Sequence, residues 1–255
     1  MPARRIALIT GPTAGIGRSS AHALCERGYD LVLVSRDRQR LDELAAELRG
    51  RHAVEVEVLP ADLADRASLA VVESRLCDES RPVELLVNNA GFGHRRPFLD
   101  NDIDDEQQML DVLVTAVLRL SHAGVRPMAA RGHGAIINVA SIAAFLPRGT
   151  YSAAKAYVVS FSRWLDLTYR GQGVRAMALC PGFVRTEFHF RMGVTRGSAP
   201  TWMWLDPDRV VREALADLDR GRSISVPSRR YKLLAALARG TPSSVQAKFQ
   251  GRGRG

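Results

Sequence analysis

Short apolar runs alternate along the chain with longer segments in which apolar residues recur at helical spacing. The apolar runs predict buried strands at residues 6–10, 31–35, 54–59, 85–87, 135–139, 174–179 and 223–226. The periodic segments predict helices at residues 19–27, 38–49, 68–77, 104–128, 151–169 and 207–218. Strands that are apolar throughout and alternate with helices are typical of a parallel sheet covered on both faces. The pattern therefore predicts an α/β fold.

The first predicted strand runs directly into a glycine-rich turn, Thr10-Gly11-Pro12-Thr13-Ala14-Gly15-Ile16-Gly17. The first glycine permits a sharp turn, and the other two let the backbone approach a pyrophosphate and the next helix pack close to the sheet. The N–H groups that begin this helix would face the phosphates. A plain tight turn is the alternative, but a strand before the turn and a helix after it are the context of a dinucleotide site. The turn favours an open, doubly wound sheet over a closed barrel.

The spacing Gly-x-x-x-Gly-x-Gly resembles that of the short-chain dehydrogenase/reductase family, and the resemblance covers roughly residues 4–227. Further motifs follow in the family's order: Asn88-Asn89-Ala90-Gly91, Ser141, Tyr151-Ser152-Ala153-Ala154-Lys155 and Pro181-Gly182. The resemblance implies a single Rossmann-type domain with a mostly parallel seven-stranded sheet flanked by helices. It also implies hydride transfer between a nicotinamide cofactor and an alcohol or carbonyl group, as in bacterial ketoacyl reductases.

Tyr151 and Lys155 stand at positions i and i+4 and therefore share one helix face. A tyrosine has a pKa of about 10, which is poor for proton transfer near neutral pH. A nearby ammonium group, aided by the positive nicotinamide of an oxidised cofactor, would lower that pKa. The resemblance makes Tyr151 the proton donor and Ser141 the group that holds the substrate oxygen. Arginine outnumbers lysine 33 to 3 in this chain, so a lysine at 155 suggests a need for a compact, titratable cation.

Ser35 and Arg36 end the second predicted strand, about twenty residues after the glycines, where the cofactor's ribose is recognised. A basic residue there suits a 2′-phosphate, so we predict NADP(H) in preference to NAD(H). A solvated arginine is the alternative reading of Arg36. The resemblance implies further cofactor contacts, although turn residues at strand ends would explain some of them. The full predicted set is Gly11, Thr13, Gly15, Ile16, Gly17, Ser35, Arg36, Asp62, Leu63, Asn89, Ala90, Gly91, Tyr151, Lys155, Pro181, Gly182, Val184 and Thr186.

The sequence departs from the family's pattern at two places. Many members carry an asparagine in the helix before the fifth strand, where it holds a water in a proton relay, and this chain has Leu113 there. A leucine side chain cannot hold a water. Ser141 and Tyr151 are ten residues apart, which is shorter than usual in the family and requires a tighter loop. Both departures leave room for a nucleotide-binding regulatory or scaffold protein of the same fold without turnover.

Residues 183–205 follow the Pro181-Gly182 motif and correspond to the family's substrate lid. This segment is rich in large apolar residues, which predict a hydrophobic carbonyl substrate such as a ketoacyl chain. A core or interface cluster is an equally good explanation. The residues concerned are Phe188, Phe190, Met192, Trp202, Met203, Trp204 and Leu205.

The formal net charge of +9 lies entirely in the C-terminal segment. Residues 1–219 hold 27 basic and 27 acidic groups, whereas residues 220–255 hold nine basic groups and no acidic one. Residues 228–239 are compatible with a basic amphipathic helix, so we consider weak contact with a membrane surface. A helix packed on the domain or at a dimer contact is the stronger alternative. The apolar side of this helix would hold Tyr231, Leu234, Leu237 and Ala238.

Other features of the sequence limit the class of protein. No apolar run approaches the length of about twenty residues that spans a membrane, and the apolar run at residues 6–9 is too short for a signal peptide. Three widely separated cysteines argue against a disulfide framework or a metal site. The basic residues are not accompanied by clustered aromatic residues, so the sequence does not indicate nucleic-acid binding. We therefore expect a cytoplasmic enzyme, homo-oligomeric by resemblance, with its oxidoreductase domain over residues 1–227 and a basic helix and tail over 228–255.

Overall fold

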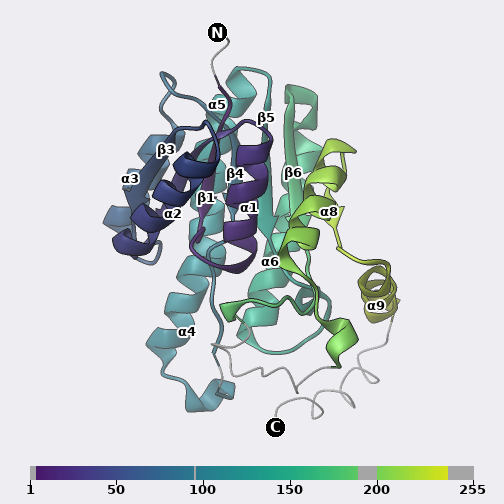
Figure 1. Cartoon of the computed structure of the whole chain (residues 1–255). Coiled ribbons are helices and arrows are strands. Elements are labelled where there is room, and N and C mark those ends of the chain that lie inside the picture. Colours follow the sequence, from purple (N-terminus) through teal and green to yellow (C-terminus); the bar gives the residue numbers. More distant parts are fainter. Residues whose placement is uncertain (1–3, 95, 189–199, 241–255) are drawn as a thin grey trace.

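A seven-stranded parallel sheet forms the centre of the protein, with helices on both of its faces (Figure 1). The computed structural model describes residues 4–94, 96–188 and 200–240. The strand order is β3-β2-β1-β4-β5-β6-β7, and each described strand pairing is parallel. This confirms the predicted Rossmann-type, doubly wound sheet. The strands are β1 (Ile6–Thr10), β2 (Asp30–Ser35), β3 (Val56–Pro60), β4 (Val83–Asn88), β5 (Gly134–Val139), β6 (Val174–Leu179) and β7 (Ile224–Ser225).

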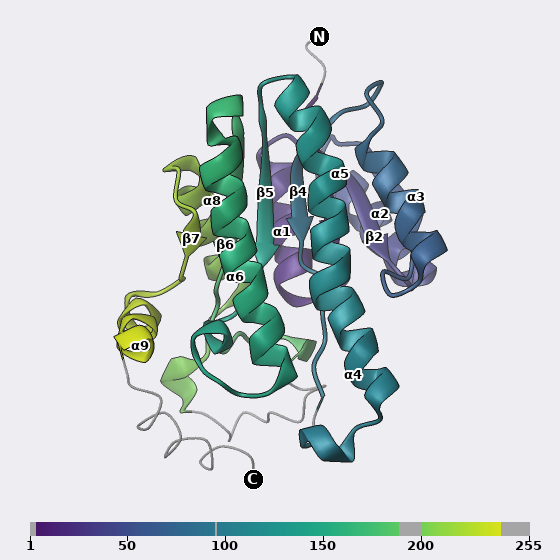
Figure 2. The same cartoon turned by 180° about the vertical axis from the view of Figure 1, so that it is seen from behind.

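The helices divide into two layers, as Figures 1 and 2 show from opposite sides. One face of the sheet carries α1 (Gly15–Glu26), α2 (Arg38–Arg51) and α8 (Pro207–Asp219). The other carries α3 (Arg66–Leu76), α5 (Ala116–Ala130) and α6 (Thr150–Tyr169). Two helices lie outside these layers, α4 (Ile103–Leu110) beyond the ends of the strands and α9 (Arg229–Gly240) beside the edge formed by β7. Single 3-10 turns are η1 (Phe98–Asp100), η3 (Ile142–Phe145), η4 (Arg170–Gln172) and η6 (Thr201–Met203).

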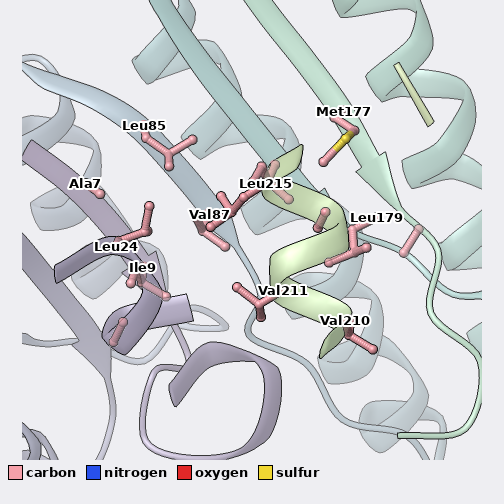
Figure 3. Close-up of a cluster of buried hydrophobic side chains, with 14 of the residues drawn as sticks. Ala7, Ile9, Leu24, Leu85, Val87, Met177, Leu179, Val210, Val211 and Leu215 are labelled. Atoms are coloured by element: carbon pink, nitrogen blue, oxygen red, sulfur yellow. The ribbon is translucent and has the colours of Figure 1, made fainter. Parts of the chain in front are cut away.

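The apolar runs of the sequence form strands because both faces of the sheet are covered. All five residues of β1 are buried, and alternate side chains point into one helical layer or the other. Figure 3 shows Leu24 of α1 with Val211 and Leu215 of α8, packed over the side chains of Ile9 and Val87. The two helices thus share one core with the central strands.

The strand order reverses between β1 and β4, which creates a crevice at the carboxyl ends of these strands. From β1 the chain builds outward through β2 to β3, and it then returns to β4 on the other side of β1. Ligands of open α/β sheets bind in the crevice at such a switch point. The glycine turn follows β1 and Asn89 follows β4, so both lie at this crevice.

Two helical predictions are refined by the structure. Residues 104–128 are helical as predicted, and a π-helical turn, η2 (Asp111–Thr115), divides them into α4 and α5. The predicted C-terminal helix is present as α9. Among its residues with described side chains, Tyr231 and Ala235 are buried, whereas Leu234 and Leu237 are exposed, and the side chain of Ala238 lies outside the described part. No helix in the described ranges combines the length and apolar character needed to cross a membrane.

Candidate active site

The turn after β1 has a backbone that only glycine fits at its three glycine positions. Gly11 and Gly15 have φ angles of +64° and +53°, which lie in the left-handed region that glycine adopts at little cost. A Cβ on Gly17 would lie 2.1 Å from the carbonyl oxygen of Gly11, and one on Gly15 would lie 2.6 Å from Cγ2 of Thr186. Thr13 lies in the same turn, and Ile16 lies in the first turn of α1 and packs against the core. These residues form a closely packed turn, Gly11–Gly17, that we call the cradle.

Asn89 joins this cradle to the end of β4. Its side-chain Nδ2 donates hydrogen bonds to the carbonyl oxygens of Thr10 (3.0 Å) and Gly11 (2.8 Å). In return, Oγ1 of Thr10 accepts from the backbone N–H groups of Asn89 and Ala90, both at 3.0 Å. The predicted ribose residue Asn89 therefore fixes the shape of the cradle.

The ends of β2 and β3 lie side by side, because Ser35 pairs with Pro60 in the parallel register. Nη1 of Arg36 lies 3.8 Å from Oδ2 of Asp62, and the Arg36 side chain is 69% exposed. Oγ of Ser35 is buried and has no hydrogen-bond partner among the described residues. Asp62 caps the backbone of Ala64, and Leu63 is buried next to it. The structure thus brings together four of the predicted cofactor residues, two at the end of β2 and two after β3.

Arg40 of α2 is a site residue that the sequence did not single out. Its Nη2 donates to the carbonyl oxygen of Thr13 at 3.2 Å and pairs with Oε1 of Glu187, also at 3.2 Å. One cation therefore connects the cradle with the beginning of the lid. In the sequence Arg40 is one of three arginines in a polar run, and only the fold shows that it turns toward the cradle.

Ser141, Tyr151 and Lys155 converge at the ends of β5 and α6. Oγ of Ser141 accepts a hydrogen bond from the N–H of Ala143 (3.1 Å) and caps η3. The Ser141 side chain is also hydrogen-bonded to Tyr151, so the short loop between them keeps the two groups in contact. Nζ of Lys155 donates to the carbonyl oxygen of Val139 (2.7 Å) and lies 5.7 Å from the centre of the Tyr151 ring.

Burial dominates the electrostatics of these two side chains. Burial raises the pKa of Tyr151 far above its ordinary value of 10.0, and the hydrogen bond from Ser141 offsets part of this rise. Burial lowers the pKa of Lys155 from 10.5 to about 8, against a smaller opposing effect of Cys180. Among the groups of the protein, Ser141 lowers the pKa of Tyr151, and the expected effect of Lys155 together with a bound oxidised cofactor stays a prediction.

Leu113 occupies the space that adjoins Lys155. It lies in the π-helical turn η2, is fully buried and belongs to an apolar cluster with Met109 and Ala154, against which the Tyr151 ring packs. A Cβ on Gly91 would lie 2.8 Å from Cδ2 of Leu113 and 3.9 Å from Nζ of Lys155. The surface beside Gly91 and Lys155 is therefore formed by the apolar side chain of Leu113.

The described parts of the lid reach both the cradle and the catalytic group. The Phe188 ring lies 5.9 Å from the Tyr151 ring, centre to centre, and Thr186 lies against Gly15. Pro181 accepts a hydrogen bond from the N–H of Ile142, Gly182 lies against the Tyr231 ring, and Val184 forms a β-bridge with Leu205. Phe190 and Met192, which were also predicted to line the substrate pocket, fall outside the described residues.

The sheet order and the glycine cradle are those of a dinucleotide-binding oxidoreductase. The sequence pattern of the short chain dehydrogenase family matches residues 5–193. The chain therefore belongs to the short-chain dehydrogenase/reductase family, which uses nicotinamide cofactors and small-molecule substrates.

Three similar proteins illustrate the range of the family. Sulfoacetaldehyde reductase 2 of Chromohalobacter salexigens is 37% identical over 188 residues, which are 72% of this chain and 74% of the relative. The very-long-chain 3-oxoacyl-CoA reductase of Anas platyrhynchos is 31% identical over 82% of this chain and 67% of its own. A solved short-chain dehydrogenase from Sphingobium yanoikuyae in complex with NADPH is 35% identical, with a TM-score of 0.84 over 92% of this chain and 94% of its own.

Proposed function

We propose that the protein reduces a hydrophobic carbonyl compound to an alcohol with NADPH, and that Tyr151 donates the proton. The observation that carries this proposal is the group formed by Ser141, Tyr151 and Lys155 at the carboxyl edge of the sheet, within reach of the glycine cradle through the lid. Two of the similar proteins are named reductases and a third was solved with NADPH, which supports the direction and the cofactor.

The residues present fit a phosphorylated dinucleotide. Glycine at residues 15 and 17 lets the turn pack closely against Thr186 and the Gly11 carbonyl, and a turn of this kind leaves its backbone free to approach a pyrophosphate. Arg36 is exposed at the end of β2, and the unpaired hydroxyl of Ser35 lies beside it; both suit a 2′-phosphate. The predicted contacts at Asp62, Leu63, Asn89, Ala90, Gly91, Pro181, Val184 and Thr186 would hold the rest of the cofactor. Bound NADPH would supply the hydride for the carbonyl carbon.

The protein's own groups would deliver the proton. Tyr151 is neutral at working pH and can donate its hydroxyl proton to the carbonyl oxygen. Burial raises its pKa and makes it a weaker acid, so the transfer depends on a nearby positive charge that stabilises the tyrosinate. The Ser141 hydroxyl, already bonded to Tyr151, would hold that oxygen in place. Lys155, with a pKa of about 8, remains mostly protonated at neutral pH and would stabilise the tyrosinate after transfer.

The surroundings of Tyr151 favour an apolar substrate. The rings of Phe188 and Tyr151 face each other at the lid, and the cluster around Leu113 forms the adjoining wall. An apolar lining with a few polar groups at one end selects a hydrophobic body attached to a carbonyl group. A panel of alkyl ketones, aromatic ketones and 3-oxoacyl thioesters, followed by NADPH absorbance, tests this proposal. Turnover of short hydrophilic aldehydes only would overturn the substrate class.

We further propose that the protein forms a homo-oligomer through α5 and α6. Leu118 of α5 and Trp164 and Leu167 of α6 are exposed, Leu167 to 75%, and an apolar group of this kind on one surface is typical of an interface. Sedimentation analysis of the intact chain should give at least twice the monomer mass. A monomer at micromolar concentration would contradict the proposal.

We also propose weak contact between α9 and an anionic membrane surface. Leu233 and Leu234 of α9 are exposed, and the first turn of this helix carries Arg229, Arg230 and Lys232. A groove of about 650 Å³ between α8 and α9 is lined mainly by basic residues. Exposed leucines beside clustered cations suit anionic lipid headgroups.

A further inference from the structure

Tyr231 is a buried side chain through which helix α9 contacts the described part of the lid. We propose that Tyr231 is a positioning residue that holds the base of the lid and thereby sets the affinity for cofactor and substrate. The proposal rests on the oxidoreductase function proposed above, but part of its test needs no turnover.

The two ends of the lid meet in a short structure that we call the neck, residues 183–185 and 203–205. Val184 and Leu205 form a parallel β-bridge. The N–H of Leu205 donates to the carbonyl oxygen of Phe183 (2.8 Å), and the N–H of Arg185 donates to that of Leu205 (3.0 Å). The neck therefore determines where the lid leaves the domain and where it returns.

Tyr231 bridges the two sides of the neck. Its hydroxyl accepts a hydrogen bond from the N–H of Phe183 (3.1 Å) and donates one to the carbonyl oxygen of Met203 (2.7 Å). Its ring lies flat against the backbone, so close that a Cβ on Gly182 would lie 2.1 Å from it. The side chain is 0% exposed. Since a buried N–H or C=O that loses its partner is costly, this one hydroxyl holds both sides of the neck.

The protonation state of Tyr231 suits this double role. Burial raises its pKa above the ordinary value, against smaller opposing effects of the Phe183 N–H and Arg230. The hydroxyl therefore stays protonated at working pH and can accept from one strand of the neck while it donates to the other. A tyrosinate could accept only.

The position of the neck affects two parts of the site, the phosphate cradle and the surroundings of Tyr151. Thr186, the residue after the neck, lies against Gly15 of the phosphate cradle. Phe188, two residues further, faces the ring of Tyr151. Because α9 also packs on η3, which begins directly after Ser141, Tyr231 relates the C-terminal helix to the cofactor side and the substrate side of the same site.

Tyr231→Phe tests the proposal, because it keeps the ring against Gly182 and removes both hydrogen bonds. We expect KM for the carbonyl substrate and Kd for NADPH to rise about five- to tenfold, or about 1–1.4 kcal/mol, with kcat within about twofold of the parent. Hydrogen exchange at the amides of Phe183 and Leu205 should become faster. The NADPH titration and the exchange measurement do not require turnover, so they remain informative if the proposed reaction is wrong.

Ser225→Ala is the matched control. It removes a buried hydrogen bond from Ser225 in β7 to Oδ2 of Asp217 in α8 (2.8 Å) and leaves both hydrogen bonds of Tyr231 in place. We expect a loss of melting temperature similar to that of Tyr231→Phe, with unchanged KM, Kd and exchange at the neck. Equal effects of the two variants on KM and Kd would reduce Tyr231 to a structural residue and overturn the proposal. A fall in kcat at constant KM and Kd would overturn it as well.

Discussion

At the scale of one residue, burial of the Lys155 ammonium lowers the stability of the folded protein and places a cation beside Tyr151. Its ammonium is buried and has a pKa of about 8 instead of 10.5, so the folded protein resists the charged form. Below pH 8 both the folded and the unfolded chain carry the proton, and the full cost of burying the charge is present. Between pH 8 and 10.5 the unfolded chain binds more protons than the folded one, so stability rises with pH.

Lys155→Met should remove this pH dependence. We expect the melting temperature of the parent to rise relative to that of Lys155→Met between pH 8 and 10.5, measured by calorimetry in matched buffers. The lost hydrogen bond to Val139 lowers the stability of the variant by a similar amount at every pH and leaves this trend unchanged. A difference in melting temperature between the two proteins that stays constant over this pH range would show that burial does not lower the pKa of Lys155.

Arg36 is the second residue whose role can be isolated. Arg36→Glu should weaken NADPH binding by about tenfold or more, because a charge-assisted bond to the 2′-phosphate is worth about 1.5–3 kcal/mol. NADH binding should change little, since NADH has no 2′-phosphate. Arg38→Glu, an equal change of charge at an exposed neighbour, is the control and should affect neither cofactor strongly. Tighter binding of NADH than of NADPH by the parent would contradict the proposed preference.

At the scale of elements, the sequence predicts the sheet and the cradle but not the direction of individual helix faces. The apolar runs locate the strands because a strand covered on both faces buries successive side chains, which are therefore apolar. The π-helical turn around Leu113 was missed because one extra residue per turn hardly disturbs a helical pattern. On α9, Leu234 and Ala235 are both apolar, and only the docking surface decides that Ala235 is buried. Arg40 and Tyr231 contact residues that are far away in the sequence, and the periodicity of the sequence does not reveal such contacts.

The cradle gives a prediction at this scale, with a matched pair of glycines. Gly15 and Gly28 both have positive φ angles, +53° and +77°, but only Gly15 is crowded, by Thr186. Alanine at either position should cost about 1–2 kcal/mol of stability from backbone strain. Only Gly15→Ala should also weaken NADPH binding, because it displaces Thr186 and narrows the cradle. Equal NADPH affinities in the two variants, measured by titration, would mean that the cradle does not hold the phosphates.

The whole molecule combines a charge-balanced domain with a basic C-terminal segment. Residues 1–219 carry equal numbers of basic and acidic groups, so the excess positive charge that would attract anionic lipid lies in residues 220–255, which include α9. The chain should sediment with vesicles that contain anionic lipid and not with neutral ones, and added salt should release it because exposed charges are screened. Equal binding to both kinds of vesicle, or to neither, would contradict the proposed contact.

Proton donation by Tyr151 is the central step of the proposed reaction. Its most direct test is the rate of NADPH oxidation by Tyr151→Phe with the best carbonyl substrate of the panel, beside Tyr169→Phe at the other end of the same helix. We predict that Tyr151→Phe lowers kcat by about 10²–10⁴-fold, the usual contribution of a general acid, and still binds NADPH. Tyr169→Phe should react like the parent. Reduction by Tyr151→Phe as fast as by the parent would contradict the mechanism.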